Sequence, residues 1–388
     1  MNVTELKKLI ESGTLPEVKR THYINNHIHT CHSFSPYTPT DAVYTAYING
    51  LATAGIMDHD TTNGAREFLA AGKLLNMPVT CGVECRVDVS MTALNGKRVN
   101  NPDQLSVAYV AMHGIPHQNL EKVDDFFKPY RVQRGIRNRK MVENINRLLS
   151  HLNISIDYDK DVLPLSVSTV TERHILFALA KKLTAKYRTP EEIVGFIKND
   201  MKIALSSKAE ANILSGRETP QFYEYDILGV LKSDMVEKFY VPATAELPKL
   251  PDFIDMVKEY GGISAYAYLG DVGSSVTGDK KAQKFEDDYI DTLFEVIKEY
   301  DFDAVTFMPT RNTKEQLDRI MNMCKENHLF QISGEDINSP RQKFVCPAYD
   351  DPKFAHLIEA AYTLIKYEQT AEKSIAKARE LIKVRFYI

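Results

Sequence analysis

Short apolar segments alternate along this chain of 388 residues with segments whose apolar residues recur at helical spacing. The apolar segments are predicted strands, and they lie at residues 21–29, 55–60, 77–84, 106–114, 261–270, 302–310 and 328–338. In such an alternation each helix returns the chain to the starting edge of the sheet, so that the next strand runs parallel to the last. The sequence therefore predicts an α/β fold with a parallel sheet or barrel.

Each predicted strand ends in a side chain that is capable of chemistry. In chain order these residues are His29, Asp58 and His59, Glu84, His113, Tyr268, Arg311 and Asp336. In α/β barrels the active site forms at the carboxyl ends of the strands, because the loops that follow them meet there. We expect these side chains to gather at one end of a barrel.

The alternation breaks after the fourth predicted strand. The next segments are amphipathic and predict helices, at residues 131–152, 171–183 and 189–200. The chain is thus predicted to have a first barrel part, a mostly helical insertion that covers the site, and a second barrel part with a C-terminal helix, at residues 1–114, 115–240 and 241–388. The C-terminal helix, expected at 354–384, has a regular apolar face that either closes the barrel or pairs with another chain.

Composition limits the partners and the location of the protein. Its 48 basic and 52 acidic residues are well mixed and give a formal charge of −4, which offers no broad positive field for extended nucleic acid or an anionic membrane. No run of about 18 apolar residues occurs. The five cysteines form no CxxC pair and no disulfide-dense pattern. We expect a soluble, cytoplasmic protein that acts on a small ligand.

His27 and His29 flank Ile28 in the first predicted strand, so their side chains project from the same face. A single histidine at a strand end is more often a surface or hydrogen-bonded residue. Imidazole and carboxylate groups at successive strand ends favour a metal site instead, because such a site needs several ligands that converge from different elements. The candidate ligands are His27, His29, Asp58, His59, Glu84, His113 and Asp336.

Five short motifs, HIHTCHS, GIMDHD, CGVE, AMHG and SGEDINSP, resemble in order and spacing those of the PHP (polymerase and histidinol phosphatase) superfamily. The resemblance covers most of residues 22–346 and implies a distorted seven-stranded (βα) barrel. Within the superfamily the chain looks most like the phosphoesterases that hydrolyse nucleoside bisphosphates or short oligonucleotides. That branch carries an Arg-His element in a helical insertion after the fourth motif, and Arg173 and His174 are similar to it.

The resemblance implies a first metal position that is complete in this chain. Its ligands are the two histidines of the first motif, the glutamate of the third and the late aspartate, which correspond to His27, His29, Glu84 and Asp336. Zinc, manganese and iron all suit such ligands.

Two further metal positions implied by the resemblance are altered. The second combines Glu84 with His113, but Tyr268 stands where the family has a histidine. The third includes His59, but Asn338 stands where the family has another histidine. Since neutral tyrosine and asparagine bind these metals more weakly than imidazole, we expect one or two ions, with room for a third.

The resemblance also implies roles in catalysis and in substrate binding. The predicted catalytic residues are Asp58, His59 and Glu84, and Glu84 would bridge two ions. Asp58 has the place of a group that orients an imidazole, of an acid–base residue, or of a loop cap. Guanidinium groups bind phosphate oxygens in a planar fork, and the predicted substrate-binding residues include Arg311 and Arg341, which lie just past strand ends, and Arg173 with His174, which the resemblance indicates. Tyr268 is added as a donor to the ligand, with a packed aromatic and a weak metal ligand as its alternative roles. The basic segment 131–140 is expected to be a solvated helix face.

These inferences predict a metal-dependent phosphoesterase that hydrolyses a small nucleotide or sugar phosphate with metal-activated water. A rival hypothesis is a barrel that has lost two histidine ligands and binds a metal or a phosphorylated ligand without catalysis. A third is hydrolysis of a carbon–nitrogen bond, as in related amidohydrolases. Metal content separates the first two hypotheses, and product analysis separates the third.

Overall fold

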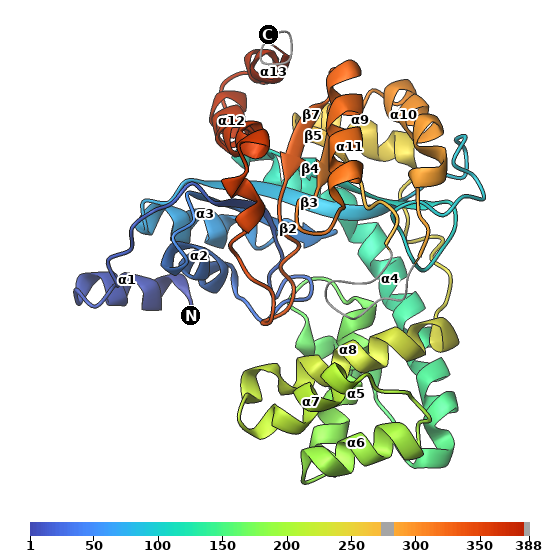
Figure 1. The fold of residues 1–388 in the computed structure, drawn as a ribbon. Helices are drawn as coiled ribbons and strands as arrows, with labels where there is room; N and C mark the ends of the chain where they lie inside the picture. The colour runs from blue at the N-terminus through green and yellow to red at the C-terminus, as the bar shows by residue number, and fades with distance from the viewer. Residues whose placement is uncertain (273–282, 384–388) are drawn as a thin grey trace.

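A computed structural model describes residues 1–272 and 283–383, and within them seven strands form one sheet in chain order (Figure 1). The strands are β1 (Ile24–Ile28), β2 (Thr53–His59), β3 (Val79–Asp88), β4 (Val107–His113), β5 (Ile263–Ala267), β6 (Ala304–Phe307) and β7 (Phe330–Ser333). Beyond β7, the Ile337 amide donates to the His27 carbonyl (3.1 Å) and the His29 amide donates to the Ile337 carbonyl (2.9 Å). These bonds nearly close the sheet, and the predicted distorted seven-stranded barrel is confirmed.

The prediction that every strand runs parallel was wrong for β4. This strand pairs antiparallel with β3, where Glu84 faces Ala111, and antiparallel with β5, where His113 faces Ile263. The physical reason lies in the connection from β3 to β4, residues 89–106, which contains no described helix. Without a crossover helix the chain turns back beside β3. The carboxyl end of β4 therefore lies at the opposite end of the barrel from those of the parallel strands.

Helices surround the barrel in both of its parts. They are α1 (Val3–Glu11), α2 (Pro39–Ile48), α3 (Ala65–Leu74), α9 (Leu250–Tyr260), α10 (Ile290–Glu299), α11 (Lys314–Glu326), α12 (Ala355–Ala371) and α13 (Ile375–Lys383). Several begin at caps that the sequence provides, as where Thr313 and Gln316 cap α11 reciprocally. Among the described helices none is long and apolar enough to cross a membrane.

The C-terminal segment closes the floor of the barrel. Leu364 and Tyr367 of α12 share a buried apolar cluster with Met57 and Ile332 of the strands, and the Tyr367 hydroxyl donates to the Gly261 carbonyl (2.9 Å). The segment is not one helix as predicted, because it breaks between α12 and α13 and the two helices pack on each other. The last predicted helical residue and the end of the second barrel part, residues 384–388, lie outside the described residues.

The segment predicted as an insertion contains five α-helices, which form a lobe of their own beside the barrel (Figure 1). They are α4 (Leu120–Leu149), α5 (Glu172–Lys186), α6 (Pro190–Asn199), α7 (Ser207–Leu214) and α8 (Pro220–Phe239). Thr189 and Glu192 form the capping box of α6, and Pro190 occupies its first position. The lobe buries its own apolar core, to which Ile145, Leu179 and Leu231 belong.

A buried ionic network joins α4 to the barrel. The basic face of α4 was expected to be solvated, but much of it is buried in this network. The Glu246 carboxylate receives Arg86 in a short ion pair and lies 3.1 Å from Arg137 Nη1. Arg137 Nη2 also lies 2.7 Å from Glu172 Oε1, and Arg134 Nη2 lies 2.7 Å from an Asp60 oxygen. The three arginines are 3 to 6% exposed. Buried charges of this kind stay ionised only when they are paired.

Replacing Glu246 by alanine should lower the free energy of unfolding by about 3–5 kcal/mol, because it leaves buried arginines without their shared carboxylate. Asp159→Ala is the matched control, since Asp159 pairs with Arg139 of the same helix at an exposed position. It should leave the unfolding free energy unchanged within error. Urea unfolding followed by circular dichroism measures both. Equal effects of the two substitutions would show that the buried network does not hold the lobe.

Candidate metal centre

Five of the predicted ligands meet at one end of the barrel. They come from the carboxyl ends of neighbouring strands, and they are His27 on β1, His29 directly after it, His59 at the end of β2, Glu84 on β3 and Asp336 after β7. β2 and β3 run parallel and place His59 opposite Glu84. The loop after β7 runs parallel to β1 at the Ile28–Ile337 bridge, and this pairing brings Asp336 to the two histidines of the first motif.

The distances between the ligand atoms fit a divalent metal ion. His29 Nε2 lies 3.3 Å from Asp336 Oδ1, His59 Nδ1 lies 3.1 Å from Glu84 Oε2, and His27 Nε2 lies 3.8 Å from Glu84 Oε1. Ligands about 2.0–2.1 Å from a tetrahedral zinc ion lie roughly 3.3 Å apart. Two groups have all their ligand atoms within 4.8 Å, His27 with His29 and Asp336, and His29 with His59 and Glu84. The residues present therefore suit a metal.

Hydrogen bonds in the loop after β1 determine which nitrogen of His29 faces the centre. The Asp58 carboxylate accepts from the Thr30 amide (2.7 Å), the Thr30 hydroxyl (2.6 Å) and the Ser33 hydroxyl (2.6 Å). Since the Ser33 proton points to Asp58, the Ser33 oxygen accepts from His29 Nδ1 (3.3 Å). His29 Nε2 is buried and faces Asp336 Oδ1, 3.3 Å away. Asp58 thus holds the loop and, through Ser33, turns Nε2 toward the centre.

Burial sets the charges of the other ligands. It lowers the pKa of His27 to about 4, an effect to which His29 adds, and it lowers the pKa of His59 well below its usual value. Both imidazoles are therefore neutral at pH 7 and offer a lone pair. Burial raises the pKa of the Glu84 carboxyl to about 8, even though His29 opposes the shift. A cation at the centre would supply the positive charge that this carboxylate lacks.

The centre opens into a cavity of about 210 Å³ between the barrel and the inserted lobe. His27, His59, Glu84 and Asp336 line it, and the Asp336 side chain is 37% exposed there. Its other lining residues are mixed in character: cationic (Arg173 of α5, Lys232 of α8 and Arg311), apolar (Leu269, Phe307 and Met308), acidic (Asp103 and Glu237) and neutral polar (Asn100, Ser233 and Gln283 among them). A smaller cavity of about 80 Å³ shares some of this lining and adds Arg86 and Arg134. Helices of the insertion therefore form part of the wall.

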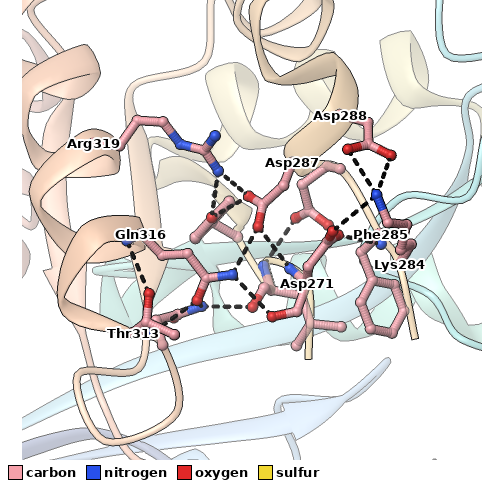
Figure 2. Close-up of polar contacts among 12 residues, drawn as sticks. Asp271, Lys284, Phe285, Asp287, Asp288, Thr313, Gln316 and Arg319 are labelled. Carbon is pink, nitrogen blue, oxygen red and sulfur yellow. Dashed lines mark hydrogen bonds and ion pairs between the residues drawn. The ribbon is translucent and has the colours of Figure 1, made fainter. Parts of the chain in front are cut away.

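Tyr268, which takes the place of a family histidine, turns its hydroxyl into a separate polar network. The hydroxyl donates to Asp287 Oδ1 (2.5 Å), and burial followed by this bond raises the pKa of Tyr268 well above its usual value. Figure 2 shows the surroundings of Asp287. Its Oδ2 accepts from Gln316 Nε2 (2.7 Å) and from the Asp271 amide (2.9 Å). Arg319 forms a short ion pair with the same carboxylate. Tyr268 lines the cavity as a neutral, fixed phenol.

Two other residues of the altered positions also have defined surroundings. Asn338 lines the cavity, and its Nδ2 donates to Asp336 Oδ1 (2.6 Å), so this amide orients a ligand. His113 ends the antiparallel strand β4 and lies toward the floor of the barrel. It belongs to neither of the groups around His29 whose ligand atoms converge, and its buried Nε2 has no hydrogen-bond partner in the described part of the chain.

Of the predicted substrate-binding arginines and histidine, Arg173 and Arg311 line the cavity, whereas the other two have structural contacts. His174 Nδ1 accepts from the Thr171 amide (3.0 Å) and so caps α5. Arg341 makes a two-pronged ion pair with Asp226 of α8, at 2.5 and 2.7 Å. Neither His174 nor Arg341 is among the residues of the described chain that line the cavity.

Sequence reasoning did not find Lys232, Tyr109 or Ser33. Lys232 is one of several lysines on inserted helices, and nothing in the spacing marks it as the one that faces the cavity. Tyr109 lies on β4 opposite Arg86, and its place at the cavity follows from the antiparallel direction of β4. Ser33 could have been found from HIHTCHS, because a hydroxyl four residues after His29 can reach back to it in a tight loop.

No protein-family model and no curated protein matches the chain. Solved structures do match. A protein from Bifidobacterium adolescentis, provisionally designated a metal-dependent phosphoesterase, is 20% identical with a TM-score of 0.55, and the match covers 88% of this chain and 97% of that one. An amidohydrolase from Chromobacterium violaceum, with bound sulfate and no metal, is 16% identical with a TM-score of 0.53, and the match covers 84% and 93% of the two chains.

The chain shares its fold with these hydrolases. The likeness extends over 97% and 93% of the two matched chains. The shared fold agrees with the PHP resemblance of the five motifs.

Replacing Ser33 by alanine should weaken metal binding about 10- to 100-fold, because His29 loses the acceptor that fixes its Nδ1 proton. Ser33→Thr keeps the hydroxyl and should restore much of the affinity. The control is Ser35→Ala in the same loop, where the hydroxyl accepts a long hydrogen bond from the Tyr37 amide (3.4 Å). Competition with a chromophoric chelator measures the Kd for Zn²⁺ or Mn²⁺. Identical affinities in the Ser33→Ala and Ser35→Ala variants would contradict the orienting role.

Proposed function

We propose that the protein is a metal-dependent phosphoesterase that hydrolyses a small phosphorylated substrate. The observation that carries the proposal is a single cavity with metal ligands at one end and two arginines in its wall. His27, Glu84 and Asp336 belong to the first part, and Arg173 and Arg311 to the second. A metal centre alone would suit many hydrolases, but guanidinium groups beside it favour an anionic substrate.

His27, His29, Glu84 and Asp336 would hold the first metal, with His59 beside them. When bound, a divalent ion lowers the pKa of a coordinated water toward neutrality and polarises a phosphoryl oxygen. Zinc, manganese and iron fit the ligands equally, and one or two ions are proposed.

The other residues of the cavity would bind and orient the substrate. Arg173 is close enough to the centre to contribute to the lowered pKa of the Asp336 carboxyl, together with His29 and against burial. Its side chain lines the same cavity as Asp336 and would meet an anionic substrate there. The apolar wall of Leu269, Phe307 and Met308 suits the base or sugar of a small nucleotide or a sugar phosphate. The helices α5 and α8 cover the cavity and limit the access of water.

The proposal includes a cytoplasmic location. All five cysteines are free thiols. Four of them are buried, which supports the reducing compartment that the sequence favours.

Replacing His29 by alanine should abolish phosphate release, with kcat/KM lower by roughly 1000-fold or more, about 4 kcal/mol of transition-state stabilisation. The substrate panel consists of nucleoside monophosphates, nucleoside bisphosphates, sugar phosphates and one amide substrate, each assayed with Zn²⁺, Mn²⁺ or Fe²⁺. His151→Ala, at an exposed position of the lobe, is the control. Activity on the amide alone would favour an amidohydrolase, and phosphate release that survives the His29 substitution would refute the proposed centre.

Replacing Arg173 by alanine should lower kcat/KM for a phosphorylated substrate roughly 10- to 100-fold, the worth of one charge-assisted hydrogen bond. Arg173→Lys should recover only part of the loss, because it lacks the planar fork. Arg341→Ala is the matched control and should change kcat/KM less than about threefold, since Arg341 faces Asp226. Steady-state kinetics decide between these outcomes, and a larger effect at Arg341 than at Arg173 would reverse the assignment.

A specific observation favours a second candidate, a barrel that binds without catalysis. Tyr268 and Asn338 replace family histidines, and both have polar partners in the structure, Asp287 and Asp336. A closed centre without an open coordination position would have no water to activate. Metal bound at one ion per chain, together with no product from any substrate above the His29→Ala background, would support this candidate over the enzyme.

A further inference from the structure

A second group of metal-binding side chains lies outside the site described above. Cys81 Sγ, a ring nitrogen of His117 and a carboxylate oxygen of Glu368 all lie within 4.8 Å of one another. Cys81 lies near the start of β3, Glu368 lies on α12, and His117 begins the short 3₁₀ turn η1 (His117–Asn119) after β4. Because β4 is antiparallel, its carboxyl end lies beside the starts of its neighbours. The group is therefore at the floor of the barrel, away from the centre around His29.

Hydrogen bonds orient each of these side chains. Glu368 Oε1 accepts from the Cys81 amide (2.6 Å) and, in a short bond, from the Thr80 hydroxyl. Its other oxygen, Oε2, lies 3.1 Å from His117 Nε2, and a Glu372 oxygen lies 2.8 Å from His117 Nδ1. Histidines that ligate a metal commonly donate their second ring N–H to a carboxylate in this way. Glu368 Oε2 and His117 Nε2 face each other, and the Cys81 thiol lies within reach of the same two side chains.

The charges of the group also favour a cation. Glu368 is 1% exposed, and Glu372 adds a second carboxylate on the far side of the imidazole. Glu372 is 41% exposed and keeps contact with solvent, so the buried charge that a cation would compensate is that of Glu368. The His117 side chain is 29% exposed, which gives an ion a path from solvent. The alternative to a bound cation is that His117 forms ion pairs with both glutamates, an arrangement in which the Cys81 thiol has no role.

We propose that Cys81, His117 and Glu368 bind a zinc ion that fastens α12 to the barrel floor. Thiolate, imidazole and carboxylate are all zinc ligands, and the thiolate disfavours magnesium, calcium and manganese. On binding, a sulfur–zinc bond forms and the thiol proton leaves to solvent. The ion would link β3, the turn after β4 and α12, three segments far apart in sequence. This site is independent of the proposed hydrolase function.

Cobalt substitution tests the site without any assay of activity. The metal-free chain is titrated with Co²⁺, and absorption from thiolate-to-cobalt charge transfer is recorded in the near ultraviolet. We expect the amplitude of this band to correspond to one cobalt–thiolate bond per chain, whatever the number of ions taken up by the other centre, and to persist in His29→Ala, because the ligands at that centre contain no sulfur. Cys81→Ser and His117→Ala should each abolish it. Zn²⁺ added afterwards should remove the band by displacing cobalt.

Two matched pairs of variants make the test specific. Cys31→Ser removes a half-buried thiol two residues from His29 and should leave the band intact. Glu372→Gln, directly after α12, should raise the Kd for Co²⁺ about 10- to 100-fold, whereas Glu359→Gln, at an exposed position of α12, should not. Absence of the band in the folded wild-type chain, or its survival in Cys81→Ser, would overturn the proposal and leave the group as an ion pair of His117 with two glutamates.

Discussion

Two main-chain hydrogen bonds between Ile337 and the residues beside Ile28 hold the ends of the sheet together, and the candidate site depends on them. Both isoleucines are fully buried in the outer core. Since side chains alternate across a strand, the neighbours of these isoleucines point into the barrel. His27 and His29 thus come to face Asp336, which is far away in the sequence. The packing of the two isoleucines on the outside of the barrel therefore determines that their neighbours, the candidate metal ligands, face the inside.

The direction of β4 divides the polar residues of the barrel between its two ends. The parallel strands carry the histidines and carboxylates of the candidate metal centre toward their carboxyl ends. β4 runs in the opposite direction, so His113 and the turn that contains His117 lie toward the floor of the barrel. α12 closes that floor with apolar residues and brings Glu368 beneath β3. The other end of the barrel, which carries the candidate metal centre, is covered by the inserted lobe. The contact between the lobe and the barrel is partly ionic.

Much of the fold could be predicted from the sequence, because the strand signals are strong and their order is simple. The motifs also led to His27, His29, His59, Glu84 and Asp336, which the structure brings together. Strand direction at β4 was missed, since alternating hydrophobicity reports which face is buried and not which way the chain runs.

The hydrogen-bond and ion-pair partners of individual side chains could not be predicted either, because a short motif does not report how a side chain is packed in the fold. Arg341 and His174 matched a motif, but their partners Asp226 and Thr171 are set by tertiary packing and by a helix cap. The face of α4 that carries Arg134 and Arg137 looked like an ordinary solvated surface, because its acidic partners lie on the barrel or at the start of α5.

The ion pair between Arg341 and Asp226 ties the loop after β7 to the inserted lobe. Arg341 lies in the same loop as Asp336 and Asn338, only a few residues further along, and its partner belongs to α8 of the inserted lobe. Its guanidinium also stacks on Phe222 of that helix, 4.4 Å from the ring centre. A displacement of the lobe away from the barrel would therefore first have to break this ion pair and this ring contact.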